Sequence, residues 1–225
     1  MVGAWAGELG QMQFMPRHYL DYGVDFDGDG RRDLLHSTPD ALASAANLLA
    51  GQGWQRGQPW LQEVRVPAEM PWEQADISIR QPRSQWARWG VTLANGQPLP
   101  ADGVATSLIL PMGRLGPAFL AYQNFQSFLK WNDSLVYSTT AAYFATRLAG
   151  AGAVRRGNGV PPALGMQDVR VMQQLLSRGG HPVGELDGKV GLKTRAAVRA
   201  AQIKFGLPAD SYPSAELLTR LRRGN

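Results

Sequence analysis

No cysteine occurs among the 225 residues of the chain. This absence excludes a disulfide framework, a thiolate metal site and a cysteine nucleophile, and it is compatible with the periplasm. Long apolar runs are missing as well, because glycine and polar residues interrupt them before they could span a bilayer. The opening stretch, MVGAWAGELGQM, has neither a basic nor an apolar region, so no signal peptide is visible.

Acidic residues are too few to balance lysine and arginine only in the last part of the chain. Residues 1–159 contain 13 lysines and arginines and 13 acidic residues, whereas residues 160–225 contain 10 and 5. A compact basic module can bind a polyanion, such as nucleic acid or an acidic cell-wall polymer, or it can be a solvated surface. No base-stacking motif or groove-binding helix is present, so we expect no nucleic-acid partner.

The chain changes character near residue 150. Its length and its hydrophobic content of 44% predict one or two globular domains. In AGAGAVRRGNGVPPALG, glycine, alanine and proline replace periodic apolar residues, which indicates a linker. We therefore predict a first domain over residues 1–150, a linker over 151–165 and a second domain over 166–225.

The second domain is predicted to contain two similar turn-helix units, which together form an internal half-repeat. Helices are expected in MQDVRVMQQLLSRGG, KTRAAVRAAQIKFGL and SAELLTRLRR, the first of them ending at its two glycines. A turn is expected at Asp187-Gly188, and Thr194 is placed to cap the second helix. A weaker echo of the turn, Asp210-Ser211, precedes the third helix.

The pattern V-x-x-x-Q-x-x-L-x-x-x-G, followed by DG-x-x-G-x-x-T-x-x-A-V-x-x-x-Q, resembles the three-helix peptidoglycan-binding domain of many cell-wall hydrolases. The resemblance implies wall contact by Asp187, Gly188, Thr194 and Gln202. Most of these positions can equally serve the core and the turns. The departure at Ser211 argues against a ligand groove formed symmetrically by both halves.

The first domain opens with GAWAGELGQMQFMPRHYLDYGVDFDGDG. Gln13 beside Phe14 pairs an amide with an aromatic face, which suits sugars, although a residue such as Phe14 is more often part of the core. As a continuous string, G-x-W-A-G-x-x-G-x-x-Q-F-M-P followed by Y-x-V-D-x-x-G-D-G resembles the lytic murein transglycosylase B family. DALASAANLLAGQGWQRGQPW and YQNFQSFLKWNDSLVYSTTAAYFATRLA resemble later segments of that family. The resemblance covers residues 3–149.

This resemblance implies a mainly α (α+β) fold. It consists of a lysozyme-like transglycosylase domain, incomplete at its N-terminus, with an EF-hand-like loop and a following peptidoglycan-binding domain. The implied enzyme is a glycan-cleaving lyase that needs no cofactor for catalysis and converts MurNAc-β-1,4-GlcNAc to a 1,6-anhydroMurNAc product. One glutamate protonates the leaving oxygen and then takes the proton of the C6 hydroxyl, so its pKa must be raised by an apolar pocket.

The sequence lacks the glutamate that this chemistry needs. In the family it stands upstream of the G-x-W-A-G string in an E-T-x-x-G context, which occurs nowhere in the 225 residues. We therefore expect the chain to be the C-terminal part of a longer enzyme, or the product of a late start codon, and to lack the acid on its own. Glu8 is a poor substitute, since the family does not use its position as the acid. Ala4 stands where many relatives have a serine that can hold the acid.

The resemblance carries substrate-binding roles over to Gln13, Phe14, Asn132, Ser134 and Tyr137. Gln13 and Asn132 are implied to bind N-acetyl or hydroxyl groups, and Tyr137 to support the acid or stack on a sugar. A polar network between helices is the alternative role. Tryptophans can be sugar platforms or, as we favour here, core residues; those concerned are Trp5, Trp54 and Trp131.

Acidic residues crowd into VDFDGDGRRDLLHS. With Asp25 as position 1 of an EF-hand loop, the expected oxygen ligands are Asp25, Asp27, Asp29, the Arg31 carbonyl and Asp33. Position 12 is His36, and imidazole is a poor calcium ligand. The loop therefore predicts a weak structural calcium site, with a self-capped acidic turn as the alternative.

A non-catalytic peptidoglycan-binding protein is the competing interpretation, with the first domain as a remnant cleft. In either case the expected partner is the glycan strand of peptidoglycan, and the expected location is the periplasm or the cell envelope. The sequence identifies neither endo or exo cleavage nor any partner from cell-wall synthesis or hydrolysis.

Overall fold

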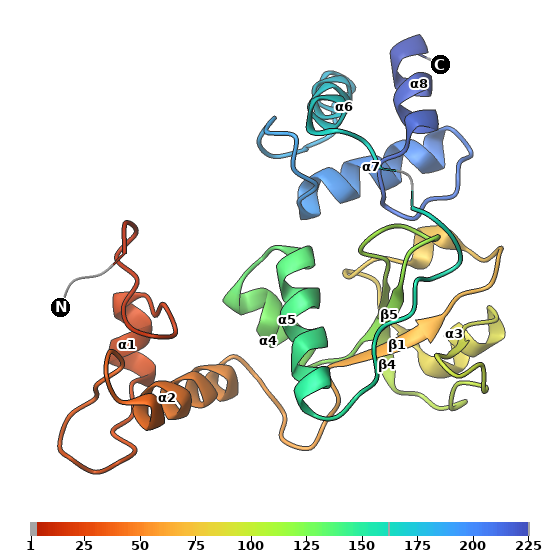
Figure 1. Cartoon of the computed structure of the whole chain (residues 1–225). Coiled ribbons are helices and arrows are strands. Elements are labelled where there is room, and N and C mark those ends of the chain that lie inside the picture. Colours follow the sequence, from red (N-terminus) through yellow and green to blue (C-terminus); the bar gives the residue numbers. More distant parts are fainter. Residues whose placement is uncertain (1–3, 162, 225) are drawn as a thin grey trace. The chain divides into compact units, whose positions relative to one another are not determined.

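The computed structural model describes residues 4–161 and 163–224. The chain forms two compact units, Met1–Gln58 and Pro59–Asn225. Helices predominate in both, and the second also contains a small sheet (Figure 1). The predicted mainly α (α+β) class is therefore confirmed. Among the residues that the structure describes, no helix combines the length and apolarity needed to cross a membrane.

The first unit is built on two helices, α1 (Pro16–Tyr22) and α2 (Thr38–Gly51). Each has a proline in its first turn, where a helix leaves N–H groups without an intrahelical partner. Ser37 caps α2, because its hydroxyl accepts the Asp40 N–H at 3.3 Å. The buried apolar residues of this unit are Phe14, Leu34, Ala41 and Leu48.

The second unit begins with a sheet part, residues 59–148. Its antiparallel sheet has the strand order β2-β4-β5-β1-β3. In chain order the strands are β1 (Leu61–Arg65), β2 (Gln81–Pro82), β3 (Thr92–Leu93), β4 (Ala105–Ile109) and β5 (Ala118–Ala121). In register, Ala121 of β5 lies opposite Leu61 of β1 and Ser107 of β4. All of β5 is buried, as its continuous apolar sequence predicts.

Two helices, α4 (Phe125–Trp131) and α5 (Leu135–Leu148), cover one face of this sheet (Figure 1). Trp60 ties α5 to the start of β1, since its indole N–H donates to the Ala142 carbonyl at 3.0 Å. The apolar cluster between helices and strands consists of Leu61, Ile109, Phe119, Ala121, Phe125, Leu135 and Ala142.

The opposite face carries a second cluster, since Leu108 and Leu120 alternate with Ile109 and Phe119 along their strands. The short helices η1 (Trp72–Gln74) and α3 (Arg83–Arg88) contribute to it. Trp86 of α3 is fully buried, and its indole N–H donates to the Thr106 carbonyl at 3.2 Å. The buried members of this cluster include Trp72, Trp86, Val91, Leu99, Leu108, Leu110 and Leu120.

The C-terminal module, residues 166–224, contains α6 (Met166–Arg178), α7 (Leu192–Lys204) and α8 (Ala215–Arg223). These are the three predicted helices. α6 ends at its two glycines, and Gly180 has φ 85°, a conformation that favours glycine. The shared core consists of Met172, Leu176, Val183, Ala197, Val198, Ala201, Leu217 and Leu218.

The predicted cap of the second module helix is wrong. Gly191, in an extended conformation, already starts α7, so Thr194 lies inside the first turn. Its hydroxyl donates to the Val183 carbonyl at 3.0 Å and accepts from the Gln173 amide at 3.2 Å. Thr194 therefore joins three segments of the module instead of capping one helix.

The segment predicted as a linker lies against the sheet part. The Arg155 N–H donates to the Glu63 carboxylate at 2.9 Å, and the Gly159 N–H donates to the Leu115 carbonyl at 3.0 Å. Composition thus identified a stretch without helix or strand, but not these hydrogen bonds. The predicted domain boundaries at 150 and 165 stay a prediction.

Candidate functional site

The acidic loop between α1 and α2 brings three carboxylates together. Asp25, Asp27 and Asp29 each offer one oxygen, and these atoms lie within 4.8 Å of one another. Asp25 also closes the loop, since its carboxylate accepts the N–H groups of Gly28 at 2.7 Å and Gly30 at 2.9 Å. Three clustered carboxylates suit a hard cation, and the two backbone bonds are those of a self-capped turn.

Asp33, the predicted ligand at loop position 9, is engaged in a different turn. Its Oδ1 accepts the N–H groups of Leu35 at 3.0 Å and His36 at 2.9 Å, and its Oδ2 lies 3.1 Å from the His36 imidazole. The hydrogen bond from the His36 N–H is the main cause that lowers the pKa of Asp33. A ligand role for Arg31 and Asp33 stays a prediction.

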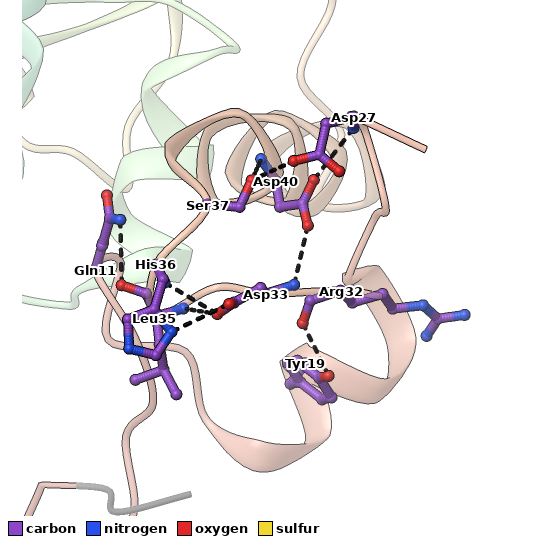
Figure 2. A network of polar contacts seen from close by, with 9 residues as sticks. All are labelled: Gln11, Tyr19, Asp27, Arg32, Asp33, Leu35, His36, Ser37 and Asp40. Atoms are coloured by element: carbon purple, nitrogen blue, oxygen red, sulfur yellow. Dashed lines mark hydrogen bonds and ion pairs between the residues drawn. The ribbon is translucent and has the colours of Figure 1, made fainter. Parts of the chain in front are cut away.

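A buried carboxylate that the sequence analysis missed holds this loop on α2. Asp40 is fully buried and accepts the N–H groups of Phe26 at 2.8 Å, Asp33 at 2.9 Å and Asp27 at 3.4 Å. Figure 2 shows the bonds from Asp27 and Asp33 meeting at this one side chain. These bonds, chiefly that from Phe26, lower the pKa of Asp40. The sequence did contain a signal for a helix start at this place, because Ser37 followed by an acid three residues later is a capping-box pattern.

The predicted sugar-binding pair lies in a tight hairpin. Leu9 and Phe14 exchange backbone hydrogen bonds of 2.7 and 2.8 Å, and Gln13 has φ 52°, which is uncommon for a residue other than glycine. The exposed Gln13 amide donates to the Gly10 carbonyl at 3.0 Å. The Phe14 ring is only 1% exposed and packs edge-on against His18. The hairpin presents the amide and buries the ring, and sugar binding by either stays a prediction.

The N-x-S-x-x-Y string forms the turn between α4 and α5. The Asn132 side chain accepts the Ser134 N–H at 2.9 Å, and the Ser134 hydroxyl accepts the Tyr137 N–H at 3.3 Å and so caps α5. The Tyr137 side chain is 52% exposed. Asn132 and Ser134 therefore build a polar turn, while Tyr137 is accessible to a ligand. Their substrate-binding roles stay predictions.

The tryptophans differ in exposure. Trp5 is fully exposed, so the core role favoured from the sequence is wrong for this residue, while Trp54 and Trp131 are partly buried. Glu8 is partly buried as well, and its carbonyl accepts the Ala4 N–H at 2.9 Å. This bond closes the turn around Gly7.

Two turns of the module share one hydrogen-bond pattern. In the first, the Gln173 amide accepts the Gly188 N–H at 2.8 Å and donates to the next residue's carbonyl at 2.9 Å. In the second, Gln202 accepts the Ser211 N–H at 3.0 Å and donates to the next residue's carbonyl at 3.1 Å. Gly188 and Ser211 have φ 80° and 62°. The predicted internal half-repeat is confirmed.

The predicted wall-contact residues differ in accessibility. The Asp187 side chain is 32% exposed, and the hydrogen bond from the Lys189 N–H, at 2.8 Å, is the main cause that lowers its pKa. Thr194 and Gln202 are buried and bonded within the module. Wall contact by these residues and by Gly188 stays a prediction.

Two family models match the chain. The one described as Transglycosylase SLT domain matches residues 1–146, and the one described as Putative peptidoglycan binding domain matches residues 165–221. The chain belongs to the lytic transglycosylase family. The resemblance drawn from its sequence motifs is thereby confirmed for the transglycosylase and for its C-terminal module.

Solved structures of this family resemble the chain over different lengths. SltB3 from Pseudomonas aeruginosa, in complex with NAG-anhNAM-pentapeptide, is 45% identical with a TM-score of 0.84, over 99% of this chain and 60% of that one. Slt35 from Escherichia coli, in complex with calcium, is 28% identical with a TM-score of 0.53, over 66% and 46%. The lysozyme-like transglycosylase fold is thus shown.

A curated relative is the membrane-bound lytic murein transglycosylase B of Escherichia coli (strain K12). It is 33% identical over 140 residues, which cover 61% of this chain and 37% of the relative. The chain therefore spans well under two thirds of the curated relative's length.

Proposed function

We propose that this chain binds the glycan strands of peptidoglycan and serves as part of a lytic murein transglycosylase. The observation that carries the proposal is the presence of a transglycosylase match and a peptidoglycan-binding match in one chain. The identity of 45% to SltB3, whose structure contains NAG-anhNAM-pentapeptide, supports the same class of ligand.

The proposed reaction cleaves the MurNAc-β-1,4-GlcNAc bond without consuming water. A carboxylic acid protonates the departing glycosidic oxygen as the bond from the MurNAc anomeric carbon breaks. The resulting carboxylate takes the proton of the MurNAc C6 hydroxyl, whose oxygen closes the 1,6-anhydro ring on the anomeric carbon. The acid is thereby regenerated.

In this proposal the acid is not among the 225 residues. No E-T-x-x-G string occurs in the sequence. Glu8, the sole glutamate before Glu63, has no match to that motif. The chain then contributes Gln13, Asn132 and Tyr137 for binding glycan, and cleavage requires an acid from outside these residues.

Purified sacculi incubated with the chain test both parts of the proposal. We expect protein bound to the sacculi without 1,6-anhydro-muropeptides detectable by mass spectrometry. Anhydro products that disappear in Glu8→Gln would show that Glu8 is the acid and contradict the proposal. Asp21→Asn, which removes an exposed carboxylate of the same unit, is the matched control.

The alternative is a non-catalytic peptidoglycan-binding protein. It is favoured by the accessible turn at Asp187 in a module matched by a peptidoglycan-binding model. The coding sequence upstream of Met1 separates the two. An in-frame E-T-x-x-G motif there supports the transglycosylase, and a sequence without one supports the binding protein.

A structural calcium ion is proposed for the loop of Asp25, Asp27 and Asp29. The donor set fits, since three carboxylate oxygens cluster and Gly30, at the sharp-turn position, has φ 85°. The related Slt35 was solved in complex with calcium. The ion would brace the loop against α2, and no step of the reaction depends on it.

Calorimetry with calcium tests this site. His36→Glu adds the missing carboxylate at loop position 12, so we expect the parent to bind with a dissociation constant of about 10⁻⁴ to 10⁻³ M and this variant to bind more tightly. His181→Glu adds the same charge in the module and should bind like the parent. Absence of calcium-dependent heat in the parent would contradict the proposal, and binding by His36→Glu alone would mean a lapsed site.

We place the working location of this protein in the periplasm or the cell envelope, where peptidoglycan lies. The names of the relatives include both membrane-bound and soluble lytic transglycosylases. Fractionation of cells that express the untagged protein would test the location.

A further inference from the structure

Helix α7 carries two arginines, one turn apart, that donate to backbone carbonyls of the sheet part. Arg195 is 5% exposed, and its guanidinium donates to the Leu110 carbonyl at 2.6 Å and to the Pro111 carbonyl at 3.3 Å. Arg199 donates to the Glu73 carbonyl at 2.7 Å. Charged donors form stronger hydrogen bonds than neutral ones. The module is therefore attached to the sheet part at several points along one helix.

Carboxylates lie beside these arginines. Asp76 Oδ2 is 3.8 Å from Arg199 Nε, and the two side chains are 14% and 25% exposed. Burial lowers the pKa of the Arg195 guanidinium, and the charges of Asp210 and Asp76 oppose that effect. Buried cations require such opposite charge nearby. Carboxylates of both the sheet part (Asp76) and the module (Asp210) therefore offset the positive charge of these arginines.

The second turn of the half-repeat meets the sheet part directly. Asp210 Oδ2 accepts the Arg114 N–H at 2.9 Å, while its Oδ1 accepts from the Gln202 amide at 2.9 Å. At Gly113, a Cβ would lie 2.9 Å from both Asp210 Oδ2 and Tyr212 Cβ, so a side chain there would collide with the turn. One carboxylate therefore completes the half-repeat and joins it to the sheet part.

The equivalent turn of the first half-repeat is much more accessible. Asp187 and Gly188 are partly buried and Lys189 is exposed, whereas the equivalent Asp210 and Ser211 are buried and Tyr212 is partly buried. The two turns have the same internal hydrogen bonds. The second turn is therefore less exposed because other parts of the chain cover it, and the sheet part is one of them.

The segment before the module is attached to the same surface. The Asn158 side chain donates to the Val66 carbonyl at 3.0 Å. At Gly157, a Cβ would lie 2.3 Å from the carbonyl carbon and oxygen of Gly116, so the two backbones cross too closely for any side chain. With the bonds at Arg155 and Gly159, these contacts fasten residues 154–159 along the sheet part.

We infer that the peptidoglycan-binding module is fixed to the sheet part through α7 and the turn at Asp210-Ser211. Of the two equivalent turns, only the one at Asp187-Gly188 is then open to a wall polymer. The wall contact rests on the proposed function; the fixed docking does not. Arg195 and Arg199 then bind the chain's own carbonyls, and they do not contribute to a polyanion-binding face.

Distance measurements between two spin labels test the docking. Because the chain has no cysteine, Thr140→Cys on α5 and Ser177→Cys on α6 provide unique labelling positions, both exposed. In this doubly labelled chain we expect one narrow distance distribution. A broad distribution would show a tethered, freely moving module and overturn the inference.

Arg195→Ala/Arg199→Ala in the labelled chain is expected to broaden the distribution. Arg178→Ala/Arg223→Ala, which removes the same charge at exposed positions of α6 and α8, should leave it narrow. Both variants should pellet with sacculi to the same extent as the labelled parent, and a loss confined to the α7 variant would overturn the division between half-repeats. Failure of the parent to pellet would contradict the proposed function while the distance result still decides the docking.

Discussion

At the scale of single residues, Ser211 occupies a backbone conformation that its sequence neighbours do not predict. It replaces the glycine of the first turn, and the sequence suggested that the two halves lose their equivalence there. The structure keeps the turn with φ 62°, because the Gln202 amide binds the Ser211 N–H. Among the described residues, the buried Ser211 hydroxyl has no hydrogen-bond partner. The sequence identified Ser211 as the position that departs from the first turn. It could not identify the hydrogen bond to Gln202 that decides the backbone conformation of Ser211.

Ser211→Gly is therefore expected to stabilise the chain by about 1 kcal/mol, since it relieves both a left-handed backbone and an unpaired buried hydroxyl. Urea unfolding measures this as a higher midpoint at an unchanged slope. The reciprocal change, Gly188→Ser, should destabilise by about 1–3 kcal/mol, because a Cβ there would lie 2.5 Å from both the Cγ and the carbonyl oxygen of Met166. A lower midpoint for Ser211→Gly would contradict the account.

Asp40 gives a prediction that depends on pH. Its pKa is lowered in the folded chain, so its stabilising effect is complete above the ordinary carboxyl pKa of about 4 and is lost as the pH falls through its folded value. Asp40→Asn should lower the melting temperature by several degrees at neutral pH, and the difference from the parent should shrink in acid. Circular dichroism melts across this range check it.

Asp21→Asn serves as the control for Asp40→Asn, because Asp21 is half exposed and pairs with Arg17 at the surface. Its melting temperature should follow the parent at every pH. A difference between Asp40→Asn and the parent that stays constant down to low pH would show that the carboxylate's charge is not what stabilises the loop.

At the scale of elements, the helices of the module were predictable and the sheet was not. α6, α7 and α8 combine apolar periodicity with local stop or cap signals, which the sequence displays directly. The strands β2 and β3 span two residues each, too few for any period to show. Their pairing depends on β1 and β4, which lie elsewhere in the chain. Local composition likewise indicated a linker without revealing its contacts.

Gly157→Ala tests the attachment of that segment. A Cβ would meet the Gly116 backbone at 2.3 Å, so the segment should detach, and trypsin should cleave after Arg155 or Arg156 faster than in the parent. Gly152→Ala is the matched control, because a Cβ there meets no atom within 4 Å. Gel electrophoresis of timed digests measures the rates, and equal rates for Gly157→Ala and the parent would contradict the attachment.

At the scale of the whole molecule, sequence motifs predicted the family and both of its parts, and the family models confirm them. The compact units divide at residue 58, whereas composition changes near residue 150. The difference arises because α7 and the second half-repeat join the module to the sheet part through contacts distant in sequence. Counting charges located the surplus of basic residues in the module. It could not reveal that two of the arginines there bind backbone carbonyls of the same chain.

Co-sedimentation with purified sacculi tests the central claim, binding of peptidoglycan by this chain, most directly. We predict that the chain pellets with sacculi, remains in the supernatant with cellulose, and still pellets when salt screens the charge of its basic module. A chain that stays in the supernatant with sacculi, or that is released from them by salt alone, would contradict the account.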